Sequence, residues 1–212
     1  SDVWTLKKID SYDRMEPLGY IGKNYQRFYI HFTSVIQNPN NKLEYYVYGK
    51  TRVSSNICSF QGMIKVKQAN CYIDSVENTS IKQGTIKGSY EFYEDSDQKE
   101  TGVLKGTFET EFYVDNRGKI QYNFLTFGAD GFSNNQFEGT WTDYKTNISK
   151  KCNWGDYRIP DDGDLDQGAG EFIPSDPYVK YGWESYRKVW VEQSEDEKWI
   201  EQEDEKWWID NQ

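Results

Sequence analysis

Residues suited to ligand binding gather in two neighbouring segments of the chain, 132–144 and 151–160. The candidates for direct contacts are Trp141, Tyr144, Trp154, Asp156 and Arg158. Flat aromatic rings stack on apolar or sugar faces, while carboxylate and guanidinium groups fix orientation through hydrogen bonds. The pattern therefore predicts a site for a small apolar molecule or a sugar. The alternative is a girdle of aromatics that plugs one end of the fold, with Arg158 stacked over Trp141 or Trp154.

Few residues are available for catalysis. His31 is the single histidine, so a Ser–His–Asp or Cys–His arrangement has to use it, and it lies in a strand-like segment without a nucleophile motif. Cys152, which precedes Asn153 and Trp154, is interpreted as structural. Two carboxylates can hydrolyse a glycoside, but among 35 acidic residues no pair stands out. We expect a protein without catalytic residues, and a hydrolase with paired carboxylates is the minor alternative.

An acidic loop is the one candidate for a metal. Asp162, Asp164 and Asp166 alternate, as in loops that wrap calcium with oxygen ligands. The sixth position of such a loop holds Gln167 instead of glycine, and the twelfth holds Ile173 instead of glutamate. We interpret the segment as a solvated loop and expect neither a metal nor another cofactor, with calcium left open.

Composition excludes several classes of protein. The chain has 212 residues, with 25 basic and 35 acidic side chains and a net charge of -10. This charge disfavours nucleic-acid binding, which depends on neutralising phosphates. No apolar run approaches the roughly 20 residues of a membrane helix. Hydrophobic residues make up 36% of the chain and aromatic residues 17%, so a core has to be built largely from aromatic rings.

The elements that would position these residues read as strands. The segment 27–36 alternates, which predicts Phe28, Ile30, Phe32 and Ile36 on one face. Further strands are expected at 43–48, 63–67, 85–93, 103–114, 120–127, 136–144 and 151–159. Three of them repeat a glycine followed two places later by an aromatic residue, a pattern that allows bending and close approach of a neighbour. We predict an all-β fold, an antiparallel up-and-down barrel, and a β-sandwich is the alternative.

The chain divides at Pro160 into a barrel domain, 1–160, and an extension, 161–212, with an acidic loop and a C-terminal helix packed on the barrel. An eight-residue repeat in this tail predicts a helix that carries Trp199, Ile200, Trp207 and Trp208 on one side. We expect this side to dock on the barrel. The alternative function is a protein–protein interaction module that uses the tryptophan-rich helix to bind a partner.

A family resemblance adds to this interpretation. Gly139-Thr140-Trp141, with Arg158 available to cover the indole, resembles the Gly-x-Trp and arginine pair of calycin barrels such as lipocalins and avidins. The resemblance implies a lipocalin-like barrel that binds a small apolar or aromatic ligand in its mouth without catalytic residues. In style the chain is also similar to exported proteins of Bacteroidetes.

We expect export to the periplasm, the cell surface or the medium. The sequence opens at Ser1 without an initiator methionine, which fits a mature or trimmed exported chain. Its three cysteines, Cys58, Cys71 and Cys152, allow one disulfide with a free thiol or a fully reduced set, and the pairing stays open.

Overall fold

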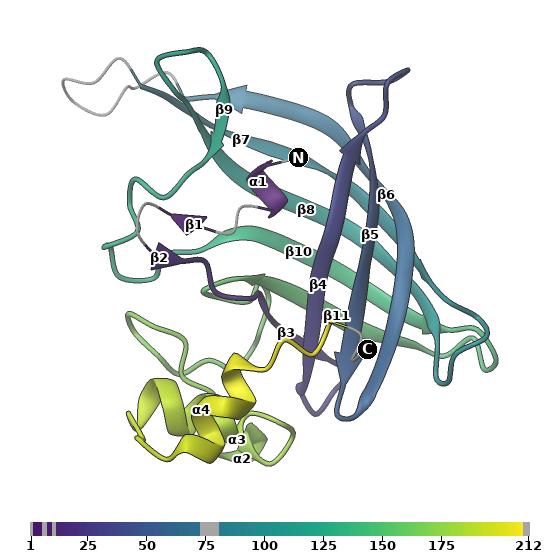
Figure 1. Ribbon diagram of the computed structural model, residues 1–212, viewed down its shortest axis with the longest axis vertical. Coiled ribbons are helices and arrows are strands. Elements are labelled where there is room, and N and C mark those ends of the chain that lie inside the picture. Colours follow the sequence, from purple (N-terminus) through teal and green to yellow (C-terminus); the bar gives the residue numbers. More distant parts are fainter. Residues whose placement is uncertain (1, 6–7, 10–11, 73–80, 210–212) are drawn as a thin grey trace.

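Eight antiparallel strands close into a barrel in the computed structural model, which describes residues 2–5, 8–9, 12–72 and 81–209 (Figure 1). The strands are β3 (Leu18–Ile21), β4 (Gln26–Gln37), β5 (Glu44–Val53), β6 (Asn56–Cys71), β7 (Lys82–Glu94), β8 (Gly102–Val114), β10 (Asn134–Asp143) and β11 (Ser149–Asp156). Each pairs with the next along the chain, except that β8 pairs with β10, and β11 returns to β3. The predicted up-and-down barrel is confirmed, and the sandwich alternative is wrong.

Three short elements lie outside this ring. Strand β9 (Ile120–Tyr122) extends the sheet from β8, and β1 (Lys8–Ile9) pairs with β2 (Tyr12–Asp13). The strand predicted at 120–127 is therefore shorter than expected, since only its first three residues pair.

Alternation along the strands decides which side chains enter the barrel. Phe28 and Ile30 are buried inside as predicted, but Ile36 is 62% exposed on the outer wall. The cause is a register shift between Phe32 and Ser34, because it moves the side chains of the following residues of β4 to the opposite face of the sheet. In β8 the alternation is unbroken, so that Leu104, Phe108 and Phe112 all point inward.

The strand glycines let neighbouring strands and rings approach. A Cβ atom on Gly106 would lie 1.9 Å from the carbonyl oxygen of Glu138, and one on Gly88 would lie 2.6 Å from the Phe108 ring. The space that a side chain would occupy is thus filled by the next strand, as the glycine–aromatic pattern predicts.

Aromatic rings fill the middle of the barrel. Trp154 stacks on Phe137 with ring centroids 5.0 Å apart, and Phe137 stacks in turn on Phe108 at 5.3 Å. Tyr90 and Phe28 also contact the Trp154 ring. The barrel is therefore solid at its centre, and any ligand space lies at its ends.

The N-terminal segment closes one end, which we call the N-terminal end. Helix α1 (Asp2–Thr5) inserts Trp4, whose indole NH donates to Thr110 Oγ1 at 3.1 Å. The carbonyl of Val3 accepts from Asn135 Nδ2 at 2.9 Å. The opposite end, called the hairpin end, is formed by the turns at 22–25, 54–55, 95–101 and 144–148.

The C-terminal extension packs on the outer wall of β3, beside and below the barrel in Figure 1. It contains helices α2 (Asp176–Val179) and α3 (Glu184–Tyr186), the π-helical turn η1 (Arg187–Val191) and helix α4 (Glu197–Asp204). Its apolar side chains cover the outward faces of Leu18 and Tyr20. The residues that do so are Leu165, Phe172, Trp183 and Tyr186, joined by Ile159 just before the extension.

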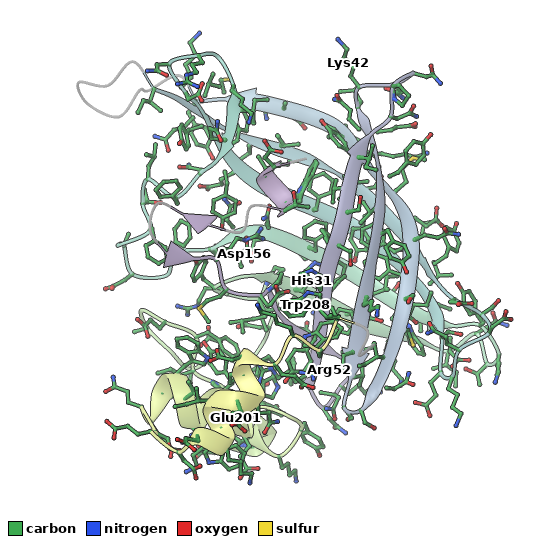
Figure 2. All side chains as sticks on the ribbon, in the orientation of Figure 1. His31, Lys42, Arg52, Asp156, Glu201 and Trp208 are labelled. Atoms are coloured by element: carbon green, nitrogen blue, oxygen red, sulfur yellow. The ribbon has the colours of Figure 1, made fainter. Side chains whose placement is uncertain are left out.

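The single tail helix predicted from the repeat is wrong in its extent. Helix α4 ends at Asp204, so that Trp207 and Trp208 lie in the segment that follows it. Trp207 is buried against Tyr29, and Trp208 stacks on His31 with ring centroids 4.0 Å apart (Figure 2). These long-range contacts fix both rings to the barrel wall and override the helical periodicity.

Candidate ligand-binding site

The five residues nominated from the sequence lie in different parts of the barrel. Trp141 and Tyr144 are at the hairpin end, where both side chains bond to Glu94: the indole NH of Trp141 to its carboxylate, at 2.8 Å, and the Tyr144 hydroxyl to its backbone carbonyl, at 3.0 Å. Trp154 is in the packed centre of the barrel and is fully buried. The structure therefore brings only the first two together.

Asp156 lies at the N-terminal end, in a buried polar network (Figure 2). Both of its carboxylate oxygens accept from Arg14 Nη2 at 2.7 Å, and Oδ2 also accepts from the Tyr122 hydroxyl and from Asn135. These bonds tie the segment after β2 to β9, β10 and β11. The network anchors the closed end of the barrel.

Arg158 points away from the interior. Its guanidinium group pairs with Asp166 at 2.7 Å and donates to the carbonyl oxygens of Gly168 and Gly170. The expected stacking of Arg158 over Trp141 or Trp154 is thus wrong, because the acidic loop takes up its donors. The cation that does lie over the Trp141 ring is Lys150, with Nζ 5.3 Å from the centroid.

A cavity opens at the hairpin end beside Trp141. Its volume is about 1060 Å³. Part of its wall is formed by inward-facing apolar and aromatic side chains, which are Ile21, Phe28, Val53 and Trp141. Such a cavity is large enough for a small organic molecule, since ligand pockets span roughly 300–1,000 Å³.

The most buried charged group of this cavity is Glu94, at the end of β7. Glu94 is 6% exposed. Its carboxylate accepts hydrogen bonds from Thr51 Oγ1, from the backbone NH of Gly102 and from the indole NH of Trp141. Burial raises the pKa of Glu94 above its ordinary value, while the three hydrogen bonds act in the opposite direction. The carboxylate thus joins β5, β8 and β10 at the mouth of the barrel.

Sequence reasoning did not nominate Glu94, although a signal for it was present. In β7 the residues at 90 and 92 point inward, and position 94 continues the same alternation. A charged residue at an inward position has to find hydrogen bonds or a counter-charge, because burying a charge without them is costly. Such a residue at a strand end therefore indicates a polar site.

A thiol in the same cavity, that of Cys58, is unreactive. Cys58 lines the same cavity, and burial, with the charge of Glu94, raises its pKa to about 12. A thiol of this kind is protonated at neutral pH and is a poor nucleophile. Cys58, Cys71 and Cys152 are all free cysteines in the part of the chain that the structure describes.

The acidic loop uses its carboxylates within the protein. Asp166 accepts from the backbone NH groups of Gly168 and Ile173, and Asp164 accepts from the Tyr178 hydroxyl. Among the described residues, no three histidine, cysteine, aspartate or glutamate side chains gather as metal ligands would.

A second concavity, of about 760 Å³, lies on the outer wall over β5 to β8. Tyr46, Tyr48 and Tyr93, each close to half exposed, stand along it. Because it lies on the open outer wall, a ligand there would keep much of its surface in water. We therefore centre the candidate site on the hairpin end.

No protein-family model, no curated protein and no solved structure gives a significant match to this chain. Within residues 2–5, 8–9, 12–72 and 81–209, no helix is both long and apolar enough to cross a membrane. The barrel and the cavity at its hairpin end are therefore the basis for assigning a function.

Proposed function

We propose that the protein is a non-catalytic binding protein that holds a small, largely apolar molecule in the cavity at the hairpin end. The observation that carries the proposal is the cavity itself, in which an indole, a phenyl ring and aliphatic side chains surround one buried carboxylate. Ligand sites have this composition, with an apolar lining and a few polar groups that fix orientation.

The inward-facing part of the lining suits an apolar or aromatic body, since Ile21, Phe28 and Val53 stand there together with Trp141, while polar side chains such as Asn56 and Ser149 line the rest of the cavity. The closed eight-stranded barrel is also compatible with the calycin likeness of the Gly139-Thr140-Trp141 motif. Export, proposed from composition, fits a carrier or scavenger of small molecules.

Two measurements test the proposal. Native mass spectrometry of the full chain as purified, compared with its denatured mass, reports a bound molecule as an extra mass that is lost on denaturation. Titration with the neutral fluorescent probe N-phenyl-1-naphthylamine then locates the site. We expect enhanced fluorescence that is weakened in Val53→Trp, which places a bulky ring inside the cavity, and kept in Ile57→Trp, which places the same ring on the exposed outer wall. Equal fluorescence in both variants would place binding elsewhere.

The alternative function, a protein–protein interaction module that uses the C-terminal extension, stays a prediction. Trp207 is buried against the barrel, whereas Trp190 is 44% exposed and Ile200 is 37% exposed on the outer side of the extension. A partner would have to bind these outward residues, because those facing the barrel are already covered.

A further inference from the structure

We infer that the ligand of the hairpin-end cavity carries a protonated amine, for which Glu94 is the counter-ion. The inference rests on the proposed binding function and adds to it the chemical class of the ligand. Glu94 differs in its partners from the other deeply buried carboxylates of the protein.

Three other buried carboxylates each pair with an arginine of the chain itself. Asp156 pairs with Arg14, Glu203 with Arg27 and Asp166 with Arg158, each with a nitrogen–oxygen distance of 2.7 Å. These pairs offset the cost of removing a carboxylate from water.

Glu94 lacks such a pair among the described residues. Its three donors are a hydroxyl, a backbone NH and an indole NH, all of them neutral. Neutral hydrogen bonds satisfy the oxygen atoms but leave the negative charge without a direct ion pair in a site of low dielectric constant. A cation that enters the cavity would supply the missing charge.

The arrangement of the three donors leaves room for that cation. Oε2 accepts from both Trp141 and Gly102, whereas Oε1 accepts only from Thr51. Because a carboxylate offers about four acceptor positions, one position on Oε1 is left for a further donor. Charge-assisted hydrogen bonds of this kind are roughly twice as strong as neutral ones.

The cavity wall selects the carbon skeleton attached to the amine. Lys150 also lines the cavity, with its Nζ 5.3 Å from the centroid of the Trp141 ring, but among the described residues it forms no ion pair with Glu94. Phe28 and Val53 offer apolar contact to the ligand. The ligand class that fits is a small primary amine with an aromatic or aliphatic body, whose ammonium group meets Glu94 and whose carbon skeleton packs on the wall.

The test compares three probes of similar shape and different charge on the full chain at neutral pH: 2-phenylethylamine, 2-phenylethanol and 3-phenylpropionate. Saturation-transfer NMR and calorimetry report their binding. We expect the amine to bind at least about tenfold more tightly than the alcohol, and the carboxylate to bind more weakly than both. This comparison uses the unmodified protein and does not depend on the folding of any variant.

Variants then assign the effect to one carboxylate. Glu94→Gln has the same shape: its amide oxygen can accept from Trp141 and Gly102, and its amide nitrogen can donate to Thr51. We expect it to bind the amine and the alcohol with equal affinity. Glu100→Gln, a change of the same type at an exposed residue on the rim of the cavity, should keep the preference.

Each contrary result has a distinct meaning. If the alcohol binds as tightly as the amine, or if Glu94→Gln keeps the preference, the assignment of Glu94 is overturned while the binding function stands. If none of the three probes binds at millimolar concentration and native mass spectrometry shows no extra mass, the binding function fails together with the amine.

Discussion

The contact between Arg27 of the barrel and Glu203 of helix α4 is a buried ion pair that joins the C-terminal extension to the barrel wall. The two side chains form two hydrogen bonds of 2.7 and 2.8 Å, and both are more than nine-tenths buried. Ser185 also donates to Glu203, and the Tyr29 ring lies 4.4 Å from the guanidinium carbon. We predict that Glu203→Gln loosens the extension while the barrel stays folded.

The magnitude follows from burial. Two unit charges about 4 Å apart attract by about 4 kcal/mol at an effective dielectric constant of about 20. Replacing one of them with a neutral group leaves the other charge buried without compensation, which costs about 3–5 kcal/mol. Since glutamine keeps one acceptor for Arg27, we expect a loss of about 3 kcal/mol in the free energy of local opening of residues 183–204.

Native-state hydrogen exchange of the amides in 183–204 measures this loss. The matched control is Glu201→Gln on the same helix, since Glu201 is exposed (Figure 2). The double variant Arg27→Met with Glu203→Leu removes both charges and should recover opening free energy to within about 1 kcal/mol of the unmodified chain. The reasoning is refuted if Glu203→Gln exchanges no faster than Glu201→Gln, or if the double variant is as unstable as the single one.

Three further predictions concern pH, the closed end and the barrel wall. Burial by itself would raise the pKa of Glu203, but the hydrogen bonds and charge of Arg27 outweigh it and hold this pKa below its ordinary value. The stabilisation by the ion pair is therefore present above the unfolded pKa of about 4.3 and is lost as the pH falls through the folded pKa. Amide exchange in α4, corrected for intrinsic rates, should accelerate below about pH 4. Asp156→Asn should lower the free energy of unfolding in urea by about 3–5 kcal/mol because it removes the charge of the buried carboxylate that pairs with Arg14, and a loss below about 1 kcal/mol would contradict the assigned network. Gly106→Ala should destabilise the barrel by at least about 1–3 kcal/mol in thermal unfolding, since its methyl group meets the Glu138 carbonyl, and an unchanged melting temperature would show that the strands do not approach so closely.

The residues of the predicted site are close in the sequence but not in the barrel. Trp141 and Asp156 are only 15 positions apart in the sequence, but β10 runs from the N-terminal end to the hairpin end and β11 runs back. Each strand rises about 3.3 Å per residue, so that neighbours in sequence lie at opposite ends of the barrel. Proximity in the chain therefore did not imply a shared site, and the inward position of Glu94 in β7 was a signal that the sequence-based prediction did not use.

The sequence by itself determined the antiparallel strands and favoured a barrel over a sandwich. Period-2 alternation, inward glycines and a surplus of aromatic rings are local features, and each strand carries them without reference to distant residues. Alternation within the segment 103–114 sets Phe108 and Phe112 on one face, and both are buried in the barrel.

Only the tertiary structure decided how the two ends and the tail are arranged, because these depend on contacts between residues far apart in the chain. Trp4 meets Thr110 across 106 positions, Arg14 meets Asp156 across 142, and Arg27 meets Glu203 across 176. Side-chain periodicity holds no information about such pairings, since they are set by closure of the sheet and by which buried charges find a counter-charge. In the folded chain three buried carboxylates pair with an arginine, whereas Glu94, at the mouth of the cavity, accepts hydrogen bonds from neutral donors.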